Sequence, residues 1–168
     1  MFDLLDLRGI LLNGLLLSLA LGVIVLGSLK YNARLWLQDY PRPIRERVPP
    51  LSPAEKRDRV VVAVLLLVVL FGGVLLETLR LRASQAGALP FGAAYLHIFL
   101  FLSVFNLFDA LVLDLFILTL LKPSFVILPG AEGMEDLFND YRKQLVDFFK
   151  GIVFCTVASL PFALLAVL

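Results

Sequence analysis

The sequence is poor in the residues that soluble enzymes and metal sites use most. Its single cysteine, Cys155, cannot form an intrachain disulfide. Its single histidine, His97, has no carboxylate at ligand spacing, so we expect no metal centre. Charged residues make up only 17% of the chain, against about 25% in typical soluble domains. The formal net charge of +1 gives no indication of a nucleic-acid partner.

Hydrophobic residues, by contrast, are in large excess. They make up 60% of the chain, and the mean hydropathy is +0.93. A domain of roughly 150 residues still leaves much of its surface in water, so it cannot hide such an excess in its core. This composition excludes a monomeric soluble enzyme and predicts an integral membrane protein.

Four apolar segments predict an all-α, four-transmembrane-helix bundle. They are Gly9–Gly27, Val60–Leu76, Phe91–Leu121 and Gly151–Leu168. A helix needs roughly 20 apolar residues to cross about 30 Å of hydrocarbon, and helices satisfy their own backbone groups in lipid. With flanking residues, we expect spans at about 9–29, 60–81, 91–121 and 147–168, all in a single domain covering residues 1–168.

The basic residues predict the orientation of these spans. Twelve of the fifteen Lys and Arg lie in two connections, Lys30–Arg59 and Lys122–Lys150. The positive-inside rule therefore predicts that both of these long loops are cytoplasmic and that both termini lie outside.

Local signals predict how the loops are structured. Ser52 and Glu55 form a capping-box pattern, so the second helix should begin near Pro53. Apolar residues at helical spacing in Glu135–Phe149 predict an interfacial amphipathic helix in the loop before the last span.

Small residues four apart mark two faces suited to close helix packing. Such residues let two backbones approach closely within a membrane. Whether each face meets a helix of this chain or of another is open at the level of sequence. The residues are Gly14, Ser18 and Gly22 in the first span, and Gly151, Cys155 and Ser159 in the last.

The third span carries a polar sector formed by Ser103, Asn106, Asp109 and Asp114. At 100° per residue, these four positions fall within roughly 140° of one helix face. Each mid-span acid costs about 2.5–3.5 kcal/mol on insertion scales. The sector is therefore either a ligand, ion or proton site facing the bundle interior or a structural polar clasp. We expect both carboxylates to point inward, with Asp109 bonded to Asn106 and Asp114 paired with Arg34.

Other polar residues give weaker indications. Glu77 and Arg80 are three apart, which is typical of a helical ion pair. The third loop contains Glu132, Asp140 and Arg142, which could face lipid headgroups together with Arg34 or could simply be solvated. No catalytic triad, phosphate loop or nucleotide fingerprint is present, and the sequence identifies no cofactor.

Three segments resemble a group of small, uncharacterised bacterial four-span integral membrane proteins. They are Tyr31–Pro41 (YNARLWLQDYP), Asn106–Asp114 (NLFDALVLD) and Phe125–Gly133 (FVILPGAEG). The resemblance supports the four-span fold and implies a location in a bacterial inner membrane. Members of the group carry a histidine shortly after an Asp-Tyr pair, whereas Asp140-Tyr141 is followed here by Arg142, Lys143 and Gln144.

The absence of catalytic motifs favours a non-catalytic function. We expect a module that binds a lipid, quinone, pigment or protein partner, or an accessory subunit of a larger membrane complex. One alternative is a membrane-embedded enzyme acting on a lipid or isoprenoid headgroup at the cytoplasmic face. Another is proton-coupled transport through an oligomer, using Asp109 and Asp114. The expected partners are the lipid bilayer and, in some of these cases, other membrane subunits or further copies of the chain.

Overall fold

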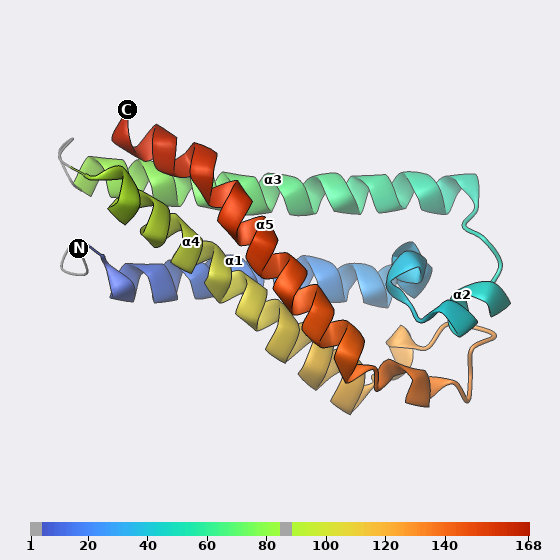
Figure 1. Ribbon diagram of the computed structural model, residues 1–168. Coiled ribbons are helices and arrows are strands. Elements are labelled where there is room, and N and C mark those ends of the chain that lie inside the picture. Colours follow the sequence, from blue (N-terminus) through green and yellow to red (C-terminus); the bar gives the residue numbers. More distant parts are fainter. Residues whose placement is uncertain (1–4, 85–88) are drawn as a thin grey trace.

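A computed structural model describes residues 5–84 and 89–168 and contains no strand within these ranges. Four helices of the described ranges are long and apolar enough to cross a membrane, and they make up most of the structure (Figure 1). The predicted all-α, four-helix membrane bundle is therefore confirmed. The long helices are α1 (Leu7–Asn32), α3 (Pro53–Ser84), α4 (Phe91–Phe108) continued by η3 (Asp109–Leu121), and α5 (Tyr141–Val167).

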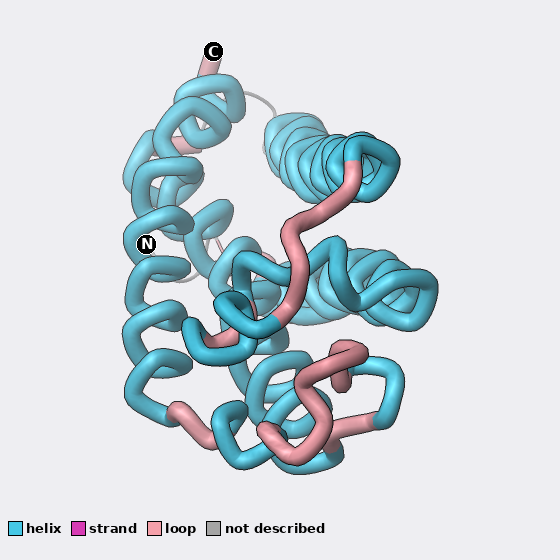
Figure 2. Tube along the Cα trace, turned by 90° about the vertical axis from the view of Figure 1, so that its right-hand side faces the viewer, coloured by secondary structure: helices cyan, strands magenta, loops and turns pink. Residues whose placement is uncertain are grey.

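The helices cross rather than run strictly parallel. α4 and α5 lie against each other and run obliquely across α1 and α3 (Figures 1 and 2). One end of the bundle, called here the terminal end, holds the first described residues and the C-terminus. The opposite end, called here the loop end, holds residues 33–52 and 122–140. Residues 85–88, in the connection between the predicted second and third spans, lie outside the described residues.

Side-chain caps fix where two of these helices begin. The Asp6 carboxylate accepts a hydrogen bond of 2.8 Å from the Gly9 backbone nitrogen at the start of α1. The predicted capping box forms at α3, because the Ser52 nitrogen donates to Glu55 Oε2 at 2.8 Å and the Glu55 nitrogen donates to Ser52 Oγ at 3.3 Å. α3 therefore begins at Pro53, as predicted.

The predicted helix over Glu135–Phe149 begins later than expected. Residues Glu135–Phe138 form only a short 3₁₀ turn, η5, and α5 starts at Tyr141. The Asp140 carboxylate accepts a hydrogen bond of 2.9 Å from the Lys143 nitrogen. Because an aspartate at this position caps the next helix instead of continuing the previous turn, it separates η5 from α5.

Glycines let α1 and α5 approach α4 closely. A Cβ atom on Gly14 would lie 2.8 Å from Val104 Cβ, and one on Gly22 would lie 3.2 Å from Phe108 Cε1. A Cβ atom on Gly151 would lie 2.6 Å from Asn106 Cγ. The glycines of the two small-residue faces thus meet a helix of the same chain.

The other members of these faces are also buried. Ser18 and Ser159 are fully enclosed, and Cys155 is 2% exposed. The two hydroxyls donate to carbonyls of their own helices, Ser18 to Gly14 at 2.7 Å and Ser159 to Cys155 at 2.6 Å. Their polar groups are therefore satisfied without a partner from another helix.

The two long loops pack on each other at the loop end. The first contains η2 (Ala33–Asp39) and α2 (Arg42–Arg47), and the second contains η4 (Ser124–Val126). The Tyr40 hydroxyl donates to the Val126 carbonyl at 2.6 Å and joins the two loops. They share a small apolar core made of Leu37, Tyr40, Ile44, Val48, Val126 and Leu128 with neighbouring residues.

The first part of α3 stands apart from the other helices. Its buried residues are Val74, Glu77, Thr78 and Leu81, and none of residues 53–73 is buried. The separation of α3 at the loop end leaves room for a pocket inside the bundle.

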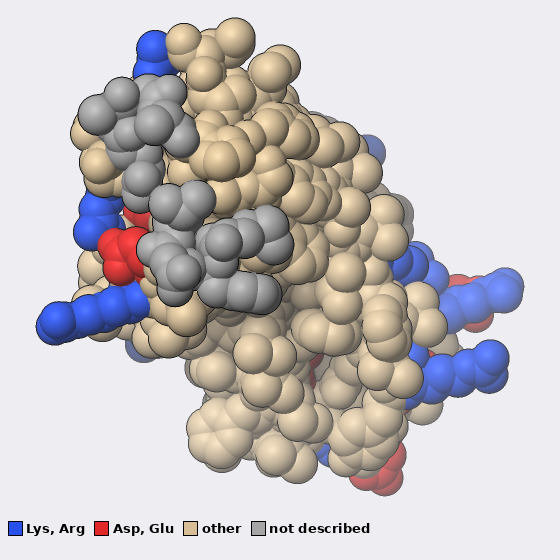
Figure 3. Space-filling model, turned by 60° about the vertical axis from the view of Figure 1, so that its left-hand side comes forward, with Lys and Arg blue, Asp and Glu red and all other residues tan. Residues whose placement is uncertain are grey.

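Figure 3 shows charged side chains gathered at two sides of the molecule with a broad uncharged surface between them.

Candidate functional site

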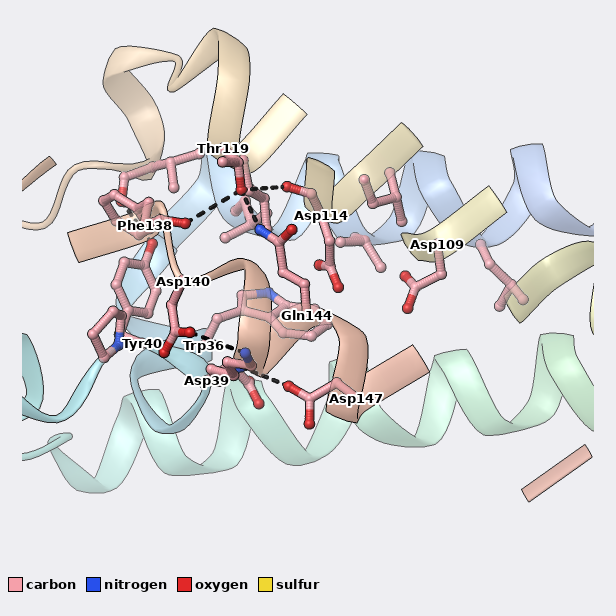
Figure 4. Close-up of a pocket in the computed structure, with 18 of the residues that line it drawn as sticks. Trp36, Asp39, Tyr40, Asp109, Asp114, Thr119, Phe138, Asp140, Gln144 and Asp147 are labelled. Atoms are coloured by element: carbon pink, nitrogen blue, oxygen red, sulfur yellow. Dashed lines mark hydrogen bonds and ion pairs between the residues drawn. The ribbon is translucent and has the colours of Figure 1, made fainter. Parts of the chain in front are cut away.

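The candidate site is a pocket of about 510 Å³ at the loop end of the bundle. Residues of α1, η2, α3, α4, η3, η4, η5 and α5 line it (Figure 4). One part of its wall is apolar and includes Leu21, Val25, Leu66, Leu70 and Phe105. The other part carries the polar groups, among them Asp39, Asp109, Asp114, Lys143, Gln144 and Asp147.

A change of helix type brings the polar groups of the third span together. From Asp109 to Leu121 the chain forms a π-helix, whose hydrogen bonds join residues five apart. In an α-helix, residues five apart differ by about 140° around the axis. In a π-helix they lie close to one turn apart, so Asp109, Asp114 and Thr119 follow one face. All three line the pocket.

Asp109 and Asp114 point inward, as expected, but their expected partners are elsewhere. Figure 4 shows both carboxylates directed into the same space. Neither carboxylate forms a hydrogen bond or ion pair with any residue in the described ranges; the one bond to Asp114 is to its backbone carbonyl. Asn106, the expected partner of Asp109, instead donates from Nδ2 to the Phe148 carbonyl at 3.3 Å.

Arg34, the expected partner of Asp114, is held by the capping box of α3. Its Nε lies 2.6 Å from Glu55 Oε1, and its Nη2 donates to the carbonyls of Pro49 and Pro50 at 3.1 Å. A guanidinium can satisfy several acceptors at once, and here the carboxylate and the two carbonyls occupy it. The prediction of an Arg34–Asp114 pair is therefore wrong.

Ser103 does not contribute to the pocket either. Its hydroxyl donates to the Phe99 carbonyl at 2.7 Å, within its own helix. Of the four residues in the predicted polar sector, the structure thus brings together Asp109 and Asp114, while Ser103 and Asn106 serve the helix and its packing. The α-helical geometry assumed for the sequence separates the two acids, whereas the π-helix aligns them.

Thr119 connects the π-helix with the neighbouring elements. Its hydroxyl lies 2.9 Å from the Asp114 carbonyl and 3.3 Å from the Phe138 carbonyl. Gln144 of α5 donates from Nε2 to the same oxygen. Thr119 is 2% exposed. Its side chain therefore holds together the three elements η3, η5 and α5 at the polar wall of the pocket.

The remaining charged groups lie on the other side of the pocket. Lys143 Nζ is 2.8 Å from Asp147 Oδ2, and Lys150 Nζ is 2.7 Å from Asp147 Oδ1. Asp39 has no bonded partner among the described residues. Asp39 is exposed to solvent as a residue, but the protein around its carboxyl removes part of the hydration and raises its pKa above the usual value, and the Lys143 ammonium lowers it again in part.

The candidates from the second long loop divide into two kinds. Asp140 both caps α5 and lines the pocket. Glu132 and Arg142 are exposed and do not line it. Glu132 accepts a hydrogen bond of 2.9 Å from the Gly130 nitrogen, in a turn where Gly130 has φ +88°. Glycine adopts this backbone conformation at little cost because it has no Cβ atom.

A buried polar network at the terminal end was missed by reasoning from the sequence. His97 Nε2 lies 2.9 Å from Glu77 Oε1, and Asn13 Nδ2 donates to Glu77 Oε2 at 2.7 Å. The side chains of His97 and Glu77 are 2% and 5% exposed. The expected contact of Glu77 with Arg80 is present at 3.8 Å, but it is the weakest of the three. The available signal was that Asn13, Glu77 and His97 are polar residues near the same end of three successive spans.

A shallow groove of about 580 Å³ lies beside this network, between α1 and α3. Its polar side chains, Asn13, Glu77 and Arg80, are already bonded to one another or, for Arg80, to Asp6 at 3.5 Å. Each polar side chain of this groove thus already has a partner within the protein, in contrast to Asp109 and Asp114 of the pocket at the loop end.

Within residues 5–84 and 89–168, no three His, Cys, Asp or Glu side chains lie close enough to hold a metal ion. Comparisons of the chain with protein-family models, with curated proteins and with solved structures give no match.

Proposed function

We propose that this protein is a membrane binding module that holds one amphiphilic small molecule, a lipid or a compound of similar build, in the loop-end pocket. The observation that carries the proposal is the division of the pocket wall into an apolar and a polar part. Its volume of about 510 Å³ lies within the range of roughly 300–1,000 Å³ typical of small-molecule sites.

The position of the pocket supports entry from the bilayer. Leu66, Leu67 and Leu70 of α3 form one wall, and Leu67 is 52% exposed on the outside of the bundle. Since residues 53–73 of α3 are not buried, a ligand can pass beside this helix without unpacking the core. Its apolar chain would then lie among the helices and its polar group beneath the two loops.

The orientation of the pocket follows from the distribution of basic residues. We propose that the loop end faces the cytoplasm of a bacterial cell and that both termini lie outside the inner membrane, because the loops carry twelve of the fifteen Lys and Arg. The polar part of the pocket then lies at the cytoplasmic surface of the bilayer.

Native mass spectrometry of the protein in lipid nanodiscs tests the binding function. We expect one amphiphile to remain bound at a ratio of one to one. Leu66→Trp fills the pocket and should abolish the retained ligand, whereas Leu65→Trp, on the neighbouring surface outside the pocket, should leave it in place. Equal retention by both variants, or only a random distribution of bulk lipids, would contradict the proposal. A co-purifying protein subunit would identify the module as part of a larger complex.

One observation favours a second candidate, a membrane-embedded enzyme acting on a lipid headgroup. Two carboxylates without bonded partners, Asp109 and Asp114, face the same pocket, and such groups can accept a proton from a substrate. In this case the Asp109→Asn variant would still bind the lipid but would not convert it, so the unmodified lipid would accumulate in the cells. Identical lipid profiles in cells producing the wild-type protein and the variant would exclude this candidate.

A further inference from the structure

We propose that the loop-end pocket selects amphiphiles whose polar group is an organic cation, such as an alkylammonium. This inference rests on the proposed binding function and specifies its ligand class. It combines three features of the pocket: unpaired carboxylates, aromatic rings whose polar atoms are already bonded, and an apolar wall.

The charge balance of the pocket is the first feature. Asp39, Asp109 and Asp114 line it, and none has a hydrogen-bonded or ion-paired partner in the part of the chain that is described. Lys143 is the only Lys or Arg among the lining residues, and Asp147 binds its ammonium at 2.8 Å. Acidic groups within membrane spans, such as Asp109 and Asp114, are normally paired, and a cationic ligand would supply the missing counter-charge.

The aromatic rings at the same end are the second feature. Trp36 Nε1 donates to Ser28 Oγ at 2.9 Å, and the Tyr40 hydroxyl donates to the Val126 carbonyl at 2.6 Å. Phe138 packs edge-on against Tyr40 with the ring centroids 5.7 Å apart. All three residues line the pocket. The polar side-chain atoms of Trp36 and Tyr40 are bonded to the protein, and Phe138 has none. The three residues therefore offer a ligand their rings, which attract cations.

The spacing of the carboxylates favours an organic cation over a metal ion. Asp39 comes from η2, and Asp109 and Asp114 come from successive turns of η3. No three carboxylates in the described ranges converge on one point, as the ligands of a bare divalent ion would. An ammonium group with alkyl substituents spreads its charge over a larger volume, and the apolar wall at Leu66, Leu70 and Phe105 can cover an attached chain.

The single tryptophan of the chain provides the test, because Trp36 lines the pocket. The purified protein is placed in nanodiscs of an uncharged glycolipid, which carries no ammonium group, and titrated with three amphiphiles that share one brominated alkyl chain. Their head groups are trimethylammonium, sulfonate and an uncharged glucoside. Bromine quenches tryptophan fluorescence at short range, so saturable quenching reports occupation of the pocket.

We expect the ammonium compound to reach half-saturation at a concentration about tenfold lower than the sulfonate, a difference of about 1.4 kcal/mol. The double variant Asp109→Asn/Asp114→Asn should remove most of this preference. Glu132→Gln, which neutralises an exposed carboxylate outside the pocket, should retain it. Asp39 lies in a loop, so the variant Asp39→Asn does not alter a spanning helix. It should weaken the preference for the ammonium compound in part.

The possible outcomes separate this inference from the proposed function. Saturable quenching with equal affinity for all three head groups would overturn the cation preference and leave the binding function intact. Quenching that only follows partition into the bilayer, without saturation, would overturn both. The comparison of head groups on the wild-type protein decides the question even if a variant does not fold.

Discussion

At the scale of single residues, two glycines of α1 differ in what surrounds them. A methyl group at Gly14 would meet Val104 Cβ at 2.8 Å, whereas one at Gly27 would meet no atom within 4 Å. We expect Gly14→Ala to reduce the free energy of unfolding by about 1–3 kcal/mol through overpacking. Gly27→Ala should be neutral or stabilise by up to about 1 kcal/mol, because alanine favours the helix.

Thermal unfolding of both variants in the same detergent measures this difference. A melting temperature of the Gly14→Ala protein equal to that of the wild type would show that α1 and α4 do not approach as closely as described.

Asp39 should make stability depend on pH. Burial raises the pKa of its carboxyl in the folded protein, so folding favours the protonated form. The stabilising contribution of that form is complete below the unfolded pKa of about 3.9 and is lost as the pH rises through the folded pKa. Asp39→Asn should therefore raise the melting temperature at pH 7 and have little effect near pH 4.

The gain at pH 7 should be small, below about 1 kcal/mol, because the residue keeps contact with water. Melting curves of the delipidated wild-type and variant proteins across this pH range give the comparison. If the gain in melting temperature from Asp39→Asn grew as the pH fell, the result would contradict a raised pKa of this carboxyl in the folded protein.

At the scale of helices, the network of Glu77, His97 and Asn13 joins α3, α4 and α1 at the terminal end. Removing one member of a buried pair leaves the other without its partner, at a cost of about 3–5 kcal/mol. We expect Glu77→Leu and His97→Leu each to be strongly destabilising. The double variant should lose less than the sum of the two, by about 1–3 kcal/mol.

A double-mutant cycle from thermal or denaturant unfolding measures this coupling. Arg80→Ala is the matched control, since the Arg80 side chain is 54% exposed and contacts Glu77 only at 3.8 Å. Strict additivity of the two leucine substitutions would show that the histidine and the glutamate act independently.

The third span shows why the candidate site was only partly predictable at this scale. The two acids and the length of the segment were evident, because Asp109 and Asp114 interrupt an otherwise apolar stretch. The residues that they face are not evident, because the sequence predicts the directions of an α-helix and the chain forms a π-helix from Asp109 onward. η3 contacts α5 and α1, and Thr119 bonds to the Phe138 carbonyl of η5. These partners are distant in the chain, so the segment by itself does not reveal them.

At the scale of the whole molecule, the orientation in the membrane is open to a direct test. We expect an impermeant thiol reagent added to intact cells to modify Ala83→Cys, at the terminal end, and not Lys56→Cys, at the start of α3. The physical reason is the concentration of Lys and Arg in the loops that share the end with Lys56. Both variants would carry Cys155→Ser, which removes the native thiol.

Labelling of both sites after permeabilisation controls for accessibility of the thiols, since Ala83 and Lys56 are both exposed. Modification of Lys56→Cys but not Ala83→Cys in intact cells would reverse the proposed topology and place the pocket at the outer surface.

The sequence by itself determined the class of this protein, its four spans and the start of α3. Each of these depends on composition or on residues close together in the chain: apolar length for the spans, and Ser52 with Glu55 for the capping box. Only the tertiary structure decided the partners of the polar groups. Glu77 and His97 are bonded across two helices, Arg34 is bonded to Glu55 instead of Asp114, and Asp109 and Asp114 share one pocket. In a membrane every helix is apolar on most of its surface, so the helical pattern does not specify which faces meet. That choice is made by close packing at a few glycines and by the few polar groups that must find partners away from lipid.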